Sequence, residues 1–192
     1  RTAVHRLREM RRQLEDRHGI IALLSFSNVA VDTFRKDYYA MSESRGGTVG
    51  FAGVEISTVD AFITANILRP HAHRTMRASR TAYLVQGGEP FLNGYKVFDG
   101  QVSHNIGKMD VRVIEGAFSY SVVFGSARRP IEAGVAEKVI AKFGLTGAYT
   151  HALGRYWALQ TLADQPHILR ALARRYPHVL IDEAQDIGGE HQ

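Results

Sequence analysis

Cysteine is absent from the 192 residues of this chain. This excludes disulfide bonds and thiolate-ligated zinc, and it is compatible with a reducing cytoplasm, which is the localisation we expect. No apolar run approaches the ~20 residues that span a bilayer, so no membrane partner is expected. A signal peptide and an initiator Met are also missing, and we therefore expect the chain to be an excised fragment.

Hydrophobic residues make up 45% of the chain and charged residues 22%. This composition predicts a packed core rather than disorder. The formal net charge is +5 and the pI is about 9.6, which makes a polyanion a plausible partner. No internal repeat or low-complexity segment is recognisable.

Strands and helices are predicted to alternate near the N-terminus. The apolar run 20–24 is typical of a strand buried on both faces, and 54–57 is a second strand. Helical spacing of apolar residues predicts a helix from Val4 to about residue 18, and further helices at 29–39 and 59–68. Pro70 is expected to end the last of these helices.

The middle of the chain has a different pattern. Short β-type runs at 83–85, 95–98, 111–114 and 120–124 are separated by glycine-containing turns, which predicts antiparallel hairpins. Helices follow at 131–143, 150–164 and from Pro166, and the final strand is 178–181. We therefore expect one discontinuous α/β domain, residues 1–70 and 146–192, that carries an inserted β-rich subdomain, residues 71–145.

The final strand ends in two carboxylates, Asp182 and Glu183, and Gln185 and Asp186 follow. Ligands of parallel sheets lie just beyond the carboxyl ends of the strands. Acids at this point can hold Mg²⁺ and activate a water beside a nucleotide. The alternative is that the acids only begin a solvated helix, whose N-terminal dipole favours them.

Three segments together resemble motifs of the UvrD/Rep/PcrA-like superfamily 1 DNA helicases. Residues 179–186, Val-Leu-Ile-Asp-Glu-Ala-Gln-Asp, are similar to the Walker B motif of that family. Residues 23–31 resemble motif Ia, and residues 55–62, with 67–69 beyond, resemble motif Ib. The resemblance covers about half of the chain and implies a RecA-like P-loop NTPase sheet, incomplete in this chain.

The resemblance also implies roles for individual residues. Asp182 would ligate Mg²⁺, Glu183 would be the general base, and Gln185 and Asp186 would couple the ATP site to the DNA site. Arg1 would lie beside the nucleotide. The expected DNA-binding residues share motifs Ia and Ib; they are Phe26, Ser27, Asn28, Thr58 and Asp60. The implied partners are ATP, single-stranded DNA and single-strand/duplex junctions.

Some positions depart from the family pattern. Val29 stands where motif Ia has Lys, Thr33 stands where a Glu often follows, and Asp60 stands where motif Ib has His. Asp60 could instead cap the helix that follows, and Phe26 could be a core residue. We expect the chain to begin just after the phosphate-binding Gly-Lys-Thr loop, and we therefore expect the fragment by itself to lack ATPase activity.

Two other classes of function remain open. The chain could be a non-catalytic nucleic-acid-binding module on a helicase-like scaffold, or a nucleotide-driven switch that does not unwind DNA. His71 and His73 have no carboxylate cluster near them in the sequence, which indicates a solvated loop rather than a metal site. Tyr149, Tyr156 and Trp157 are interpreted as core residues rather than a base-stacking platform.

Overall fold

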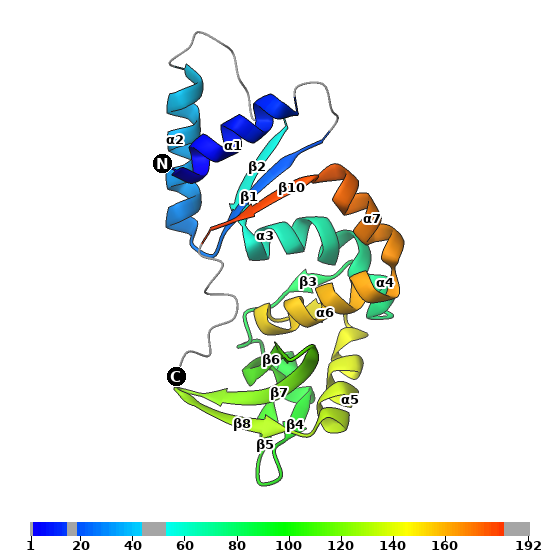
Figure 1. Ribbon diagram of the computed structural model, residues 1–192. Coiled ribbons are helices and arrows are strands. Elements are labelled where there is room, and N and C mark those ends of the chain that lie inside the picture. The colour runs from blue at the N-terminus through cyan, green and yellow to red at the C-terminus, as the bar shows by residue number, and fades with distance from the viewer. Residues whose placement is uncertain (1, 15–18, 44–52, 183–192) are drawn as a thin grey trace. The chain divides into compact units, whose positions relative to one another are not determined.

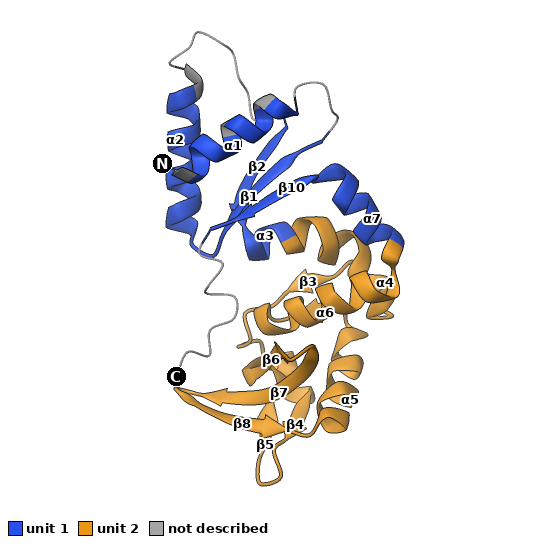
Figure 2. Cartoon of the chain, in the orientation of Figure 1, with its two compact units in different colours: residues 1–62, 167–192 blue, residues 63–166 orange. Residues whose placement is uncertain are grey.

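The computed structural model describes residues 2–14, 19–43 and 53–182 of the chain. The chain divides into two compact units, shown in Figure 2. Unit 1 combines residues 1–62 with residues 167–192, and unit 2 is residues 63–166. Unit 1 is therefore assembled from the two ends of the sequence, and unit 2 is continuous.

Unit 1 is built on a parallel sheet of three strands (Figure 1). The strands are β1 (Ile21–Ser25), β2 (Val54–Thr58) and β10 (His178–Ile181), in the spatial order β10-β1-β2. In the register, Leu24 of β1 lies beside Ile181 on one side and Ser57 on the other. The three strands therefore reach the same edge of the sheet at their carboxyl ends.

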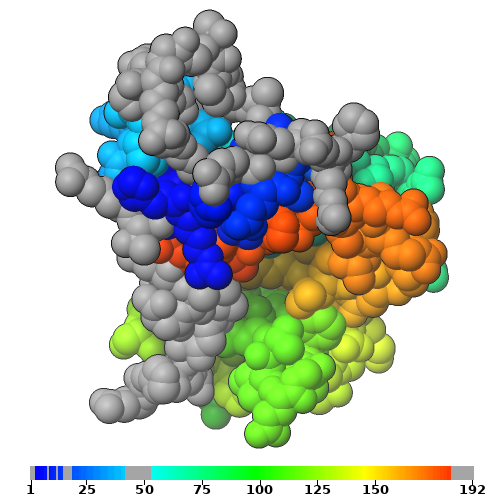
Figure 3. All heavy atoms as spheres, turned by 45° about the horizontal axis from the view of Figure 1, so that its top comes forward, coloured from blue at the N-terminus to red at the C-terminus, as the bar shows by residue number. Residues whose placement is uncertain are grey.

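Helices pack against both faces of this sheet because β1 is apolar on both sides. Ile21 and Leu23 join a core with residues of α1 (Thr2–Gln13) and α2 (Asn28–Glu43). Ala22 and Leu24 join a second core with residues of α3 (Val59–Ile63) and α7 (Pro166–Arg175). The expected burial of this strand on both faces is confirmed. Much of α7 lies on the molecular surface, where it is orange in Figure 3.

Unit 2 contains small sheets and helices. Its three-stranded antiparallel sheet has the order β6-β7-β8, β4 and β5 form a hairpin, and β3 pairs with β9. The strands are β3 (Tyr83–Leu84), β4 (Lys96–Phe98), β5 (Ser103–Asn105), β6 (Met109–Ile114), β7 (Ala117–Phe124), β8 (Ala127–Ile131) and β9 (Ala148–Tyr149). The helices are η1 (Thr64–Ala72), α4 (His73–Thr75), η2 (Pro90–Gly94), η3 (Ile106–Lys108), α5 (Ala133–Gly144) and α6 (His151–Asp164).

Two sequence predictions for this region are wrong. Pro70 does not end the helix that begins at Val59, because it lies inside η1, a nine-residue π-helical segment that continues into α4. The wider π turn displaces the usual hydrogen-bond ladder, so a residue without an N–H can be accommodated. Strand β3 does not form a hairpin either, since it pairs in parallel with the distant β9.

The border between the units also differs from the expected subdomain border. Unit 2 begins at Ile63 rather than residue 71, and it extends to Pro166 rather than residue 145. The reason is that η1 packs against α6, and both belong to unit 2. Gly154 of α6 faces this contact, and a Cβ there would lie at an ordinary van der Waals distance, 3.4 Å, from Cδ1 of Leu68.

The packing of α5 against α6 gives a stability prediction for unit 2. A Cβ added at Gly144 would lie 2.6 Å from Cζ2 of Trp157, whose side chain is buried. Gly144→Ala should therefore destabilise the protein by about 1–3 kcal/mol through overpacking. Urea unfolding followed by the fluorescence of Trp157, the chain's single tryptophan, measures this effect in unit 2.

Gly94→Ala is the matched control, because a Cβ at Gly94 would meet nothing within 4 Å. Its unfolding free energy should stay within about 0.5 kcal/mol of the wild type. Equal losses in the two variants would contradict the packing described for Gly144.

Candidate functional site

The carboxyl ends of β1, β2 and β10 form one continuous edge of the parallel sheet. Neighbouring strands of a sheet lie about 4.8 Å apart, so the three ends span about 10 Å. The described residues with predicted site roles follow these ends directly, with Phe26 after β1, Asp182 after β10 and Thr58 at the end of β2. The fold therefore brings together parts of three motifs that are far apart in the sequence.

At the end of β1, a serine-rich turn leads into α2. The buried Oγ of Ser25 accepts a hydrogen bond from the Ser27 amide at 3.2 Å, and Oγ of Ser27 accepts one from the Ala30 amide at 3.4 Å. Ser27 therefore caps the helix, as a hydroxyl residue can at this position. Phe26 is half-buried and Asn28 is exposed, so both can be reached from this edge.

At the end of β2, Thr58 takes the capping role that the sequence suggested for Asp60. Oγ1 of Thr58 accepts a hydrogen bond from the Ala61 amide at 3.2 Å. The prediction that Asp60 caps this helix is therefore wrong, because the capping residue is Thr58. Asp60 lies in the first turn of α3, where the helix dipole favours an acid. Ser57 was predicted only as a strand residue, yet its buried Oγ finds no hydrogen-bond partner among the described residues.

At the end of β10, Asp182 continues the sheet by one backbone hydrogen bond. Its amide donates to the carbonyl of Leu24 at 2.8 Å, which holds the residue beside the end of β1. The Asp182 side chain is partly exposed at this edge. The other predicted residues of the ATP site, Arg1, Glu183, Gln185 and Asp186, lie outside the described residues.

Arg35 of α2 supports the outer side of β2 and was not singled out in the sequence. Its Nε and Nη2 both donate to the carbonyl of Ile56, at 3.2 and 2.8 Å, and its Nη1 lies 3.7 Å from Asp32. A guanidinium can satisfy an edge carbonyl in this way because it has several coplanar donors. The only sequence signal was an Arg one turn after an Asp within a predicted helix.

The residues at this edge are compatible with Mg²⁺ bound through a nucleotide. Magnesium prefers oxygen ligands and needs only one or two carboxylates when phosphates and waters complete its shell. Asp182 supplies one carboxylate at the end of β10, which pairs with the central strand β1. Within residues 2–14, 19–43 and 53–182, no group of three or more His, Cys, Asp or Glu side chains could hold a metal without such help.

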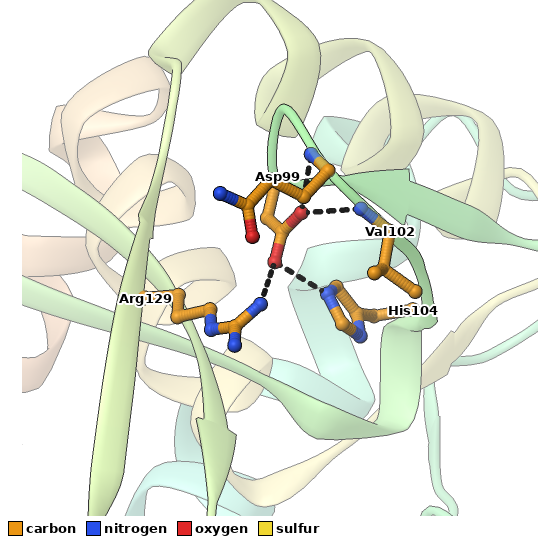
Figure 4. Close-up of polar contacts among 5 residues, drawn as sticks. Asp99, Val102, His104 and Arg129 are labelled. Atoms are coloured by element: carbon orange, nitrogen blue, oxygen red, sulfur yellow. Dashed lines mark hydrogen bonds and ion pairs between the residues drawn. The ribbon is translucent and has the colours of Figure 1, made fainter.

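A second polar cluster lies in unit 2, around Asp99 (Figure 4). Oδ1 of Asp99 accepts hydrogen bonds from the amides of Gln101 and Val102, at 2.8 and 2.7 Å. Oδ2 contacts Nε2 of His104 at 2.8 Å and accepts a hydrogen bond from Nη1 of Arg129 at 3.2 Å. One carboxylate therefore joins the β4–β5 hairpin to β8. The sequence indicated only a turn here, because Arg129 is distant along the chain.

The hydrogen bond from the Val102 amide, followed by those from His104 and Gln101, holds the pKa of Asp99 well below its ordinary value. An aspartate with a depressed pKa in the folded protein contributes stability above its unfolded pKa of about 3.9, and this contribution is lost as the pH falls. The cluster can therefore stabilise unit 2 at neutral pH without taking part in a reaction.

This dependence of stability on pH predicts a difference in unfolding temperature between the wild type and Asp99→Asn. The variant should unfold at a lower temperature at pH 7, and the difference should shrink as the pH falls from about 5 to about 2. Thermal unfolding at a series of pH values measures it. Unfolding temperatures that stay separated by a constant amount across this range would contradict the role of the Asp99 charge.

Comparison of the chain with protein-family models, with curated proteins and with solved structures finds no match. Among the helices in the described part of the chain, none is long and apolar enough to cross a membrane.

Proposed function

We propose that the chain is part of the first motor domain of a UvrD-like, ATP-dependent DNA helicase. Such a protein hydrolyses ATP to move along single-stranded DNA and to open single-strand/duplex junctions. The observation that supports this proposal is the parallel alignment of β10, β1 and β2. It puts residues from all three helicase-like motifs at one edge of a sheet that has helices on both faces.

The end of β10 is the proposed nucleotide side of this edge, and the ends of β1 and β2 are the proposed DNA side. Asp182 would hold Mg²⁺ on the nucleotide, Glu183 would accept the proton of the attacking water, and Gln185 would orient that water. Bound Mg²⁺ would neutralise charge on the transferring phosphoryl group. By the family resemblance, Asp186 would couple this site to the DNA side of the edge, and Arg1 would contact the nucleotide; both lie outside the described residues.

The ends of β1 and β2 form the proposed DNA side. Phe26 is half-buried at this edge, so part of its ring can stack on a base without reading its identity. Ser27, Asn28 and Thr58 offer hydroxyl and amide groups that can contact phosphates and sugars. Asp60 differs from these residues because its side chain is negatively charged. In the first turn of α3, this charge stabilises the helix rather than attracting a polyanion.

Glu183→Gln tests the catalytic proposal in the full-length gene product. Steady-state phosphate release with ATP, Mg²⁺ and single-stranded DNA should fall by roughly 10²–10⁴-fold, since a general base contributes about that factor. Binding of a fluorescent ATP analogue should persist. Glu115→Gln, in an exposed turn of unit 2, is the matched control and should keep full activity. Undiminished phosphate release by Glu183→Gln would refute the proposal.

A second candidate, a non-catalytic nucleic-acid-binding module, is favoured by the distribution of charge. Unit 2 contains 12 Lys and Arg against 7 Asp and Glu, whereas unit 1 contains 12 of each. The whole net charge of +5 therefore belongs to the unit that contains only residues 67–69 of the helicase-like motifs. If no phosphate release is measured and DNA is bound with strong salt dependence, this candidate replaces the first.

A further inference from the structure

Three aromatic rings of unit 2 come together between the antiparallel sheet and α6. Phe118 and Tyr120 are two residues apart on β7, so their side chains share one face of the sheet. Tyr156 of α6 lies against both of them, and α5 and α6 pack against this sheet (Figure 1). Tyr120 is buried, whereas Phe118 and Tyr156 are partly exposed. These three residues, the aromatic cluster, therefore reach the surface of the protein instead of only filling its core.

The rings of the aromatic cluster are inclined to one another rather than stacked. The centroid of the Tyr156 ring lies 4.9 Å from that of Phe118 and 6.3 Å from that of Tyr120, at interplanar angles of 58° and 61°. The centroids of Phe118 and Tyr120 are 6.3 Å apart, at an angle of 40°. An aromatic face attracts a cation that lies within about 6 Å of its centroid. The three centroids are close enough together for one cation to lie within that range of all of them.

A carboxylate stands beside the aromatic cluster. Oε1 of Glu137, an exposed residue of α5, accepts a hydrogen bond from the Tyr120 hydroxyl at 2.9 Å. Burial, followed by the charge of Glu137, raises the pKa of Tyr156, so the same carboxylate acts on a second phenol. The ion pairs within the described part of the chain do not include Glu137. The carboxylate therefore has no countercharge among these residues.

The basic residues of unit 2 that lie over aromatic rings do so at other places. Lys108 and Arg129 lie over Phe124, at 4.8 and 5.9 Å from its centroid. Lys142 lies over Tyr95, at 5.9 Å from its centroid. Where the chain is described, its own cations thus leave the aromatic cluster open to a cation from another molecule.

We propose that the aromatic cluster and Glu137 bind an alkylated ammonium group. The rings attract the cation through their faces, and the carboxylate supplies the opposite charge. Val113 pairs with Phe118 across the sheet and is 53% exposed, so it offers an apolar contact to the alkyl groups. Unit 2 as a whole is positively charged and repels cations, so this attraction is local to the site. Such a site takes neither nucleotide nor nucleic acid, and it is separate from the proposed function.

NMR titration of choline, observed on the ligand in the presence of the full-length protein, tests this site. The matched neutral ligand is 3,3-dimethylbutan-1-ol, which has the same shape as choline without its charge. Choline should bind at least about fivefold more tightly, because only the charged ligand is attracted by the rings and by Glu137. Equal affinities for the two ligands, or no saturable binding of choline, would overturn the proposal.

Phe118→Leu/Tyr156→Leu removes two ring faces and keeps apolar side chains in their place. This variant should bind choline about tenfold more weakly and should bind the neutral alcohol within about twofold of the wild type. Phe98→Leu replaces an exposed ring of β4 and is the control, with unchanged choline binding expected. Undiminished choline binding by the double variant, or an equal loss in the control, would contradict the assignment.

Glu137→Gln separates the charge from the packing, because its amide oxygen can still accept the hydrogen bond of Tyr120. Choline binding should weaken by about threefold or more, since the opposite charge is lost. Asp32→Asn, which removes a negative charge from an exposed position on α2, is the matched control and should bind choline as the wild type does. Equal losses in these two variants, or tighter binding by Glu137→Gln, would overturn the role of the carboxylate.

An alkylated ammonium group can come from a small molecule or from a methylated lysine of a protein. Titration with a short peptide that contains one trimethyllysine distinguishes these sources. Tighter binding of the peptide than of choline assigns the site to a protein, and equal or weaker binding assigns it to a small molecule. These titrations need neither ATP nor DNA, so their outcome does not depend on the proposed function.

Discussion

The parallel pairing of β10 with β1 is the interaction on which the account of unit 1 depends. It joins residues 178–181 to residues 21–24, and the amide of Asp182 extends it by one hydrogen bond to Leu24. Because the pairing is parallel and in register with β2, the three strands end together rather than at opposite edges. A shift by one residue would move every side chain of β10 to the other face and would carry Asp182 away from Ser25.

The two units differ in how their sheets are covered and in where their charged side chains are held. In unit 1, apolar strand residues are covered by helices on both faces, and Ser25, Thr58 and Asp182 stand at the carboxyl ends of the strands. In unit 2, a small antiparallel sheet is covered on one face only, and single carboxylates organise its basic residues. Asp99 holds Arg129, and Asp110 holds Arg112 and Arg128. Buried or shared carboxylates of this kind fix cations in place while the unit keeps its positive excess.

The sequence predicted the parts of the fold that depend on local pattern. The apolar runs that become β1, β2 and β10, and the helices near them, follow from the periodicity of apolar residues. It did not predict the features that depend on distant partners. Pro70 was expected to end a helix because local rules do not include π turns, and β3 pairs with β9 across many intervening residues. The contacts of Asp99 and Asp110 with arginines of β8 were missed for the same reason.

The proposed function requires the carboxyl ends of β1, β2 and β10 to form one metal–nucleotide and DNA site. Paramagnetic broadening of backbone amide signals by Mn²⁺-ATP in the full-length protein tests it most directly, because the effect falls steeply with distance from the ion. We predict strong broadening at Asp182, Ser25, Ser27 and Thr58, and weaker broadening at Ile21, Val54 and His178, which lie at the amino ends of the same strands. Broadening that is centred elsewhere, or that spares Asp182, would contradict it.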